Sequence, residues 1–330
     1  MIGKFGVDMG RKVLKPCVVA LIALLAGCAR SGAPYTPSLA APNQEHRAPS
    51  ATGIPALVLS EPTTLLLFDS GLNQIGQIHT ASVQGGAIAL DREGDIYFAG
   101  YDEYADRLFI YPPPYTSSQK ITFKGYVRGV AVDWRNDVFA LATDPLAPND
   151  HGGIYFFRHG DLKPCATVGL PTGVYTDTVS VNFDGEGTFF TALQNGGSGG
   201  IITSVSGECN AKTFVTYSPA VPNVNHLQFN SSDQLVIEES DLSNDAPIVT
   251  FPHPSNGRVG KPLFKTKLHF LNKRPPVMLT YNSDGSALWA ANVFIGGAVG
   301  LYNYPAGGTP TKVLNLQRID GGAVFPPLKP

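Results

Sequence analysis

From residue 54 onward, short apolar runs alternate with polar turns, and one unit of this pattern recurs along the chain. In residues 87–98 an apolar run ends in an Asp, a short polar turn containing Gly follows, and a second apolar run begins. Four later segments repeat this arrangement at intervals of 42, 51, 46 and 52 residues. The residues that open the five turns are Asp91, Asp133, Asp184, Asn230 and Asn282. A recurring unit of this length indicates an architecture in which each repeat is one supersecondary unit.

Each pair of apolar runs is followed by two further candidate strands before the next turn. In the first repeat these are residues 107–111 and 120–123, and in the second they are residues 153–157 and 165–168. Four strands in about 40–50 residues are typical of one blade of a β-propeller. An Asp or Asn side chain at the start of a turn can accept hydrogen bonds from the backbone that follows. We therefore interpret the five turn residues as structural rather than catalytic.

The two ends of the repeat region predict how the ring closes. Residues 56–59, 64–68 and 74–79 form three candidate strands that no first strand precedes. Residues 321–325 resemble the first strand of a blade. Joining these segments gives a sixth blade and covers two strand edges that an open array would expose. The sequence thus predicts an all-β fold, a six-bladed β-propeller of four-stranded blades whose last blade is closed by N- and C-terminal strands.

The composition agrees with this fold and excludes several others. The 330 residues include 36 Gly and 27 Pro, and only 15% are charged, against about 25% in an average globular domain. This composition argues against a helical bundle, a coiled coil and a charge-driven disordered chain. The net charge of −2 argues against a nucleic-acid-binding protein, which would normally carry a basic surplus.

Residues 1–27 have the pattern of an export signal. Basic residues precede an apolar run at 16–26, which is too short to span a bilayer. The run ends in Leu25-Ala26-Gly27-Cys28, which resembles the lipobox of bacterial lipoproteins. The resemblance implies that Cys28 is lipidated and becomes the mature N-terminus. Ala29 after it implies sorting to the outer membrane in bacteria that have two membranes.

Residues 28–53 are rich in Pro, Ala and Ser and show no apolar period, as expected of a flexible tether. We therefore expect a lipoprotein signal peptide at 1–27, a tether at 28–53 and a single propeller domain at 54–330. A start at Met9 instead of Met1 would give the signal better proportions. The expected location is the bacterial cell envelope, at the outer membrane or cell surface, where a monomer would be held by its lipid.

The turn pattern resembles that of NHL-like and lactonase-like six-bladed propellers over the whole repeat region. Lactonase-like propellers hold a divalent cation with a Glu, two Asn and an Asp, so the resemblance implies Ca²⁺, Mg²⁺ or Mn²⁺ bound by oxygen ligands. The residues that could supply such a set are Asp177, Asn225, Glu239 and Asn292. The Glu of that family normally lies at the inner strand of the first blade, where this chain has Gln84-Gly85-Gly86. We therefore expect no cofactor, and a metal-dependent hydrolase of the lactonase type is the alternative.

Other short motifs give little support for catalysis. Residues 196–200 match G-x-S-x-G, but here they join two strands of one blade, whereas that motif needs a strand-to-helix turn. Cys165 and Cys209 have no CxxC or HxxxH partner for zinc. Export would permit a disulfide between them, but they lie near outer strands of successive blades and bridging needs Cα atoms within about 7 Å. The sequence leaves this disulfide open.

A propeller binds ligands where its loops converge at one end of the axis. The loops that precede the first strands, and those between second and third strands, lie on that face. The candidate ligand-binding residues from these loops are Arg128, Asp177, Asn225, His226 and Glu239. Polar groups of both signs above an apolar channel are typical of a pocket, and the alternative is that they are solvated at a wide mouth. We expect a binding module for a protein, a glycan or a small molecule, and we assign no catalytic residue.

Overall fold

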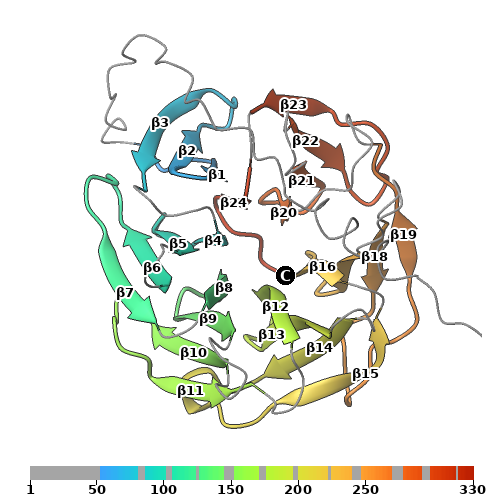
Figure 1. Cartoon of the computed structure of the whole chain (residues 1–330). Helices are drawn as coiled ribbons and strands as arrows, with labels where there is room; N and C mark the ends of the chain where they lie inside the picture. The colour runs from blue at the N-terminus through green and yellow to red at the C-terminus, as the bar shows by residue number, and fades with distance from the viewer. Residues whose placement is uncertain are drawn as a thin grey trace, which may run out of the picture. The chain divides into compact units, whose positions relative to one another are not determined.

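The computed structural model shows six antiparallel sheets of four strands each, arranged in a ring (Figure 1). The predicted all-β propeller is confirmed. No helix in the part of the chain that the structure describes is long and apolar enough to cross a membrane. The described residues are 53–80, 86–101, 106–123, 126–144, 152–170, 176–195, 200–221, 224–239, 247–269, 278–291, 298–316 and 319–330.

Each blade takes its strands in chain order from the centre of the ring outward, and the sixth blade combines both ends of the repeat region. Blade 1 contains β4 (Ile88–Leu90), β5 (Ile96–Tyr101), β6 (Asp106–Tyr111) and β7 (Gln119–Phe123). Blade 2 contains β8 (Tyr126–Val132), β9 (Val138–Asp144), β10 (Gly153–Arg158) and β11 (Ala166–Gly169). Blade 3 contains β12 (Thr176–Phe183), β13 (Phe189–Asn195), β14 (Gly200–Val205) and β15 (Val215–Val221), with the 3-10 turn η1 (Glu208–Asn210) after β14.

The remaining blades follow the same order. Blade 4 contains β16 (Val224–Phe229), β17 (Leu235–Glu239), β18 (Ile248–Phe251) and β19 (Phe264–Thr266). Blade 5 contains β20 (Met278–Tyr281), β21 (Ala287–Ala291), β22 (Ala298–Asn303) and β23 (Lys312–Asn315). Blade 6 contains β24 (Gly321–Val324), β1 (Leu57–Glu61), β2 (Thr64–Phe68) and β3 (Gln74–His79).

The sixth blade is closed in the way that the sequence predicts. β24 pairs antiparallel with β1, in a register that runs from Leu57 opposite Val324 to Ser60 opposite Gly321. A backbone hydrogen bond of 3.0 Å from Phe325 to Ala56 extends this pairing by one residue. Each of the two strands therefore covers an edge that the other would expose in an open array.

The turn between the first and second strands of a blade depends on its opening residue. Asp91 Oδ1 accepts the backbone N–H groups of Glu93 at 2.9 Å and Asp95 at 2.8 Å. Asp184 and Asn230 accept the same two bonds, two and four residues downstream. These contacts confirm the structural role predicted for the opening residues, because a short side-chain acceptor satisfies N–H groups that the turn leaves free.

The fourth residue of each turn has a left-handed backbone. The residues at this position are Gly94, Asn136, Gly187, Asp233 and Gly285, with φ angles from +54° to +90°. Glycine adopts this conformation without a steric penalty, and Asn and Asp tolerate it better than other residues with a side chain. This requirement explains why a Gly recurs in the polar turns of the sequence, and why Asn or Asp replaces it in two of them.

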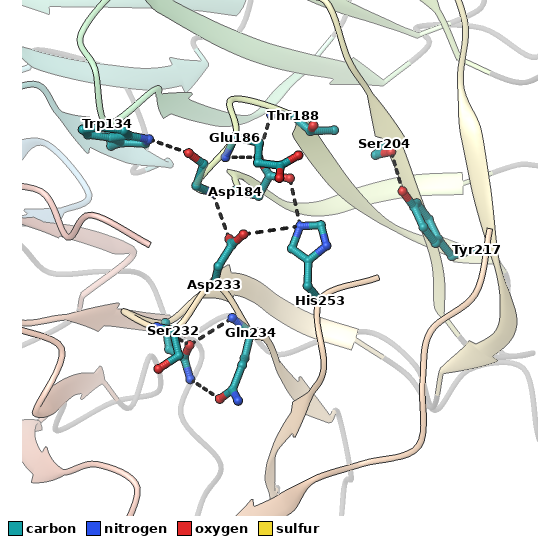
Figure 2. A network of polar contacts seen from close by, with 12 residues as sticks. Trp134, Asp184, Glu186, Thr188, Ser204, Tyr217, Ser232, Asp233, Gln234 and His253 are labelled. Atoms are coloured by element: carbon teal, nitrogen blue, oxygen red, sulfur yellow. Dashed lines mark hydrogen bonds and ion pairs between the residues drawn. The ribbon is translucent and has the colours of Figure 1, made fainter. Parts of the chain in front are cut away.

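Two of the turns are bonded to the following blade by a histidine. His159, after β10 of blade 2, places Nε2 3.0 Å from Asp91 Oδ2 of blade 1. His253, after β18 of blade 4, places Nε2 3.0 Å from Asp184 Oδ2 of blade 3 and 3.7 Å from Asp233 Oδ2 (Figure 2). Hydrogen bonding to Asp184 raises the pKa of His253, against the opposing effect of desolvation. The imidazole thus joins two blades through a buried carboxylate, and protonation strengthens this contact.

The turns of blades 4 and 2 are also bonded to the following blade, but through residues other than histidine. Asn230 Nδ2 in blade 4 donates to the hydroxyl of Tyr304, after β22 of blade 5, at 3.3 Å. In blade 2, Arg135 donates to Asp133 at 2.7 Å and also pairs with Glu208 of blade 3. Each of these four turns is therefore fixed to the connection between the third and fourth strands of the next blade.

The outer edges of blades 3 and 4 are also covered by the following blade. Ser218 of β15 exchanges backbone hydrogen bonds of 3.0 Å with Gly257 and Val259 of blade 4. Gly308 of blade 5 makes bonds of 2.7 and 2.9 Å with the backbone of His269 and Lys267, just after β19. These bonds occupy backbone groups at one point along each outer edge that would otherwise be available for pairing with another chain.

A disulfide joins blades 2 and 3 near their outer strands. Cys165, next to β11, is bonded to Cys209 in η1, and their Cα atoms lie 5.0 Å apart. The sequence left this bridge open because both residues fall near outer strands of different blades. The connection after β14 turns toward blade 2, and it brings the two residues within bridging distance.

We expect the contribution of His253 to fold stability to depend on pH. Its folded pKa lies above the unfolded value of about 6.5. The stabilisation is therefore complete below that value and is lost as the pH rises through the folded pKa. His253→Gln should lower Tm by about 2–4 °C near pH ~5.5 and by much less near pH ~9, in thermal denaturation followed by circular dichroism.

The matched control is His269→Gln, an exposed histidine of the same blade. It should leave Tm unchanged at both pH values. An equal loss of Tm at acid and alkaline pH for the His253 variant would contradict the assignment of a charged contact.

Candidate functional site

The first strands of all six blades surround a central channel with a volume of about 560 Å³. These strands are β4, β8, β12, β16, β20 and β24, and each contributes lining residues. The volume lies within the range of about 300–1,000 Å³ that is typical of small-molecule sites. The channel is therefore the first place to look for a ligand.

The segment after β24 enters one end of this channel. Pro327, Leu328 and Pro330 line the cavity, and Figure 1 places the C-terminus at the centre of the ring. Lys329 Nζ lies 4.4 Å from the centroid of the Trp134 ring, in the turn of blade 2. The carbonyl oxygen of Pro330 lies so near Gly185, in the turn of blade 3, that a Cβ there would be 3.3 Å away. We call residues 327–330 the floor of the channel.

The opposite end, which we call the mouth, carries polar side chains. Arg128 near the start of β8, Asn225 and His226 near the start of β16, and Asp320 just before β24 all line the cavity there. Arg128 is exposed, and its guanidinium carbon lies 5.4 Å from the centroid of the Tyr126 ring. Groups of both charges thus converge at the mouth from strands that are far apart in the sequence.

The other sequence candidates do not join this group in the described part of the chain. Glu239 pairs with Lys265 of the outer strand β19, at 3.6 Å, and does not line the channel. The backbone of Asp177 lies in β12, but its side chain is outside the described residues, as is Asn292. Of the oxygen ligands proposed for a lactonase-type cation, the described residues place Asn225 alone at the channel.

Two buried polar residues of blade 4 were missed by the sequence reasoning. Gln228 in β16 lines the channel and is 6% exposed, and Glu238 in β17 is fully buried. Burial raises the pKa of Glu238 well above its usual range, and the neighbouring Asn225 side chain acts in the opposite direction. A signal for Glu238 was present, because it follows three buried apolar residues of one strand.

A second cluster of titratable groups lies at the blade 1–2 contact rather than at the channel. The ligand atoms of Asp91, Asp95 and His159 lie within 4.8 Å of one another, and burial raises the pKa of Asp95 to about 6. Asp91 Oδ1 already accepts two backbone N–H groups. Its Oδ2 accepts the Tyr97 hydroxyl at 3.2 Å and lies 3.0 Å from His159. We assign this cluster to stabilisation of the turn and of the contact between blades.

Comparisons with known proteins support the fold. No protein-family model and no curated sequence matches the chain. A chain in the structure of a nidogen/laminin complex matches with a TM-score of 0.57 and 13% identity, over 83% of this chain and 98% of that one. TolB from Acinetobacter baumannii matches with a TM-score of 0.54 and 13% identity, over 81% of this chain and 65% of that one. A luciferin-regenerating enzyme matches with a TM-score of 0.52 and 11% identity, over 73% and 79%.

Identities this low establish a shared β-propeller architecture and nothing about the ligand. The same architecture carries unrelated activities, so function has to be argued from the site. The fold and the channel together define the chain as a six-bladed β-propeller protein.

Two deletion variants should distinguish the contribution of the closing strand β24 to fold stability from that of the floor. Removing residues 317–330 takes away β24, exposes the edge of β1 and leaves blade 6 incomplete, so Tm should fall by about 10 °C or more. Removing residues 326–330 keeps β24 and takes away only the floor contacts, so the fall should be about 2–4 °C. Thermal denaturation of both variants checks this, and equal losses of Tm would contradict the distinction.

Proposed function

We propose that this chain is an exported, lipid-anchored β-propeller that binds a ligand or a protein partner at the mouth of its central channel. The observation that carries the proposal is the asymmetry of the channel. One end receives the floor, Pro327–Pro330, whereas the other gathers Arg128, Asn225, His226 and Asp320. A concave site with an apolar wall and a few converging polar groups is the usual form of a binding pocket.

The comparisons are compatible with a binding role. The nidogen/laminin structure is that of a complex, so a propeller of similar architecture is found bound to another protein. No observation on the described residues favours the lactonase-type hydrolase, because Glu239 is engaged by Lys265. Binding without catalysis therefore accounts for the channel with the fewest assumptions.

Membrane anchoring rests on the sequence at Leu25-Ala26-Gly27-Cys28. Residues 28–53 would then separate the lipid from the ring by a flexible segment rich in Pro, Ala and Ser. A single acyl chain holds a protein only marginally, and stable anchoring takes at least two lipid chains. Anchoring through Cys28 alone would therefore need more than one lipid chain on that residue.

Photo-crosslinking in cells tests binding at the mouth. A photoreactive phenylalanine analogue replaces Arg128, and the same analogue at Leu162 is the control, because Leu162 is 44% exposed outside the channel. We expect mass spectrometry to find an adduct that forms at position 128 and is absent at position 162. The absence of any adduct at position 128, or the same adducts at both positions, would overturn the proposal.

Anchoring is tested separately by Cys28→Ser. We expect the variant to leave the membrane fraction and to partition into the aqueous phase of a detergent-phase separation, because the acceptor for the lipid is gone. The matched control is Cys17→Ser, which lies within the apolar run of the signal and should keep wild-type partitioning. Unchanged partitioning of the Cys28 variant would rule out lipidation at this residue.

A further inference from the structure

The two halves of the channel wall differ in chemistry. Blades 6, 1 and 2 contribute small apolar residues below the mouth, among them Ala87, Ala89, Ala131 and Ala323. Apart from Arg128 and Asp320 at the mouth, the polar side chains that line the channel come from blades 3, 4 and 5. A ligand that fills this channel has one apolar side and one hydrogen-bonding side.

Blade 4 contains two buried polar side chains with groups that the described protein leaves unsatisfied, one lining the channel and one next to it. Gln228 Nε2 is buried and meets no acceptor, and neither carboxyl oxygen of Glu238 meets a partner at hydrogen-bonding distance and angle within the described residues. The strand register places these two side chains on one face of blade 4, since Gln228 lies opposite Val236, and His226 lies opposite Glu238. Buried polar groups without partners are rare in folded proteins, and an unseen water or ligand is a common reason for them.

The side chains of this wall indicate the class of ligand that it can bind. Burial favours the neutral form of the Glu238 carboxyl group by raising its pKa, and the neighbouring Asn225 side chain acts in the opposite direction. A neutral carboxylic acid offers one donor and one acceptor, as the amide side chains of Asn225 and Gln228 do. The amide side chains of Asn225 and Gln228, which line the channel, therefore offer paired donors and acceptors to a ligand.

Neighbouring hydroxyl groups match such pairs better than peptide groups do. Each hydroxyl both donates and accepts, so two adjacent hydroxyls can bond both atoms of one side-chain amide. In a trans peptide group the N–H and C=O point in opposite directions, so one amide side chain cannot reach both. The C–H face of a pyranose ring is apolar and would lie against the alanine wall.

Building on the proposed function, we propose that the channel binds a neutral saccharide ring, with its hydroxyl groups on Asn225 and Gln228 and its C–H face on the alanine side chains of blades 1, 2 and 6. Glu238 lies next to Asn225 behind this wall, and we treat it as a positioning residue that acts through Asn225 rather than on the ligand. Saccharide recognition at this wall explains why blade 4 keeps a buried acid and a buried amide where apolar residues would pack without unmet groups.

The experiment uses the full chain in detergent on an array of neutral and acidic oligosaccharides, followed by calorimetric titration with the oligosaccharide that binds best. We expect binding to neutral oligosaccharides. Gln228→Ala and Glu238→Leu should weaken it by about tenfold or more, because each removes a contact or its support. Glu238→Gln, which keeps a neutral donor and acceptor, should restore binding to within about threefold of the native chain.

The matched control is Gln119→Ala, on the exposed outer strand β7, which should not change affinity. Glu238→Leu should not lower Tm, because it removes an unmet buried carboxyl group, and Gln228→Ala tests the same wall if that variant does not fold. Absence of binding to every neutral oligosaccharide, or binding that survives Gln228→Ala, would overturn the saccharide assignment. Binding on a parallel peptide array alone would assign the channel to a polypeptide and overturn it too, while the crosslinking result at Arg128 decides the proposed function independently.

Discussion

The pairing of β1 with β24 is the contact on which the rest of the ring depends. A four-stranded blade cannot bury its two faces alone, and each face packs against a neighbour. Phe190 of blade 3 lies 4.9 Å from Phe229 of blade 4, and Tyr97 of blade 1 lies 4.7 Å from Phe139 of blade 2, between ring centroids. An open array would leave one face of its first blade and one face of its last blade unpacked. The pairing of the terminal strands removes both ends at once.

The turn side of the ring is held by a repeated polar contact between blades. The residue that opens a turn accepts hydrogen bonds from the turn backbone through one side-chain atom. The other polar atom of that side chain contacts the next blade, as Asp184 does with His253. The chemistry of the partner varies among His, Tyr and an Arg–Glu pair. The position of the contact between a turn and the next blade recurs, whereas its charge does not. The position therefore matters more for holding the blades together than the charge of any single contact.

The periodic part of this structure was predictable because it is local. The turn after Asp91 depends on residues two and four positions away, and the left-handed position of Gly94 follows from the same short segment. His159 was not predictable, because it lies 68 residues after its partner Asp91. The disulfide and the floor were hidden for the same reason, since each joins segments from different blades.

The candidate site shows a second limit on what the sequence alone can predict. Residue type and spacing point to Glu239 at the end of β17, whereas the residue next to Asn225 is Glu238. The register of β16 against β17 shifts between Val224 and His226. Successive residues of a strand point to opposite faces, so the two neighbouring glutamates have opposite environments, and a one-residue shift of register exchanges the faces on which they lie relative to β16. Residue type and spacing alone cannot locate such an irregularity.

The start of β1 has a consequence for how the molecule would stand on a surface. Because β1 runs antiparallel to β24, the chain enters the ring on the side where the floor lies, and Ile54 lies against Gly94 in the turn of blade 1. The mouth is on the opposite side. A tether of the kind proposed for residues 28–53 would therefore join the ring on its closed face, and the mouth would lie on the face away from the point of attachment.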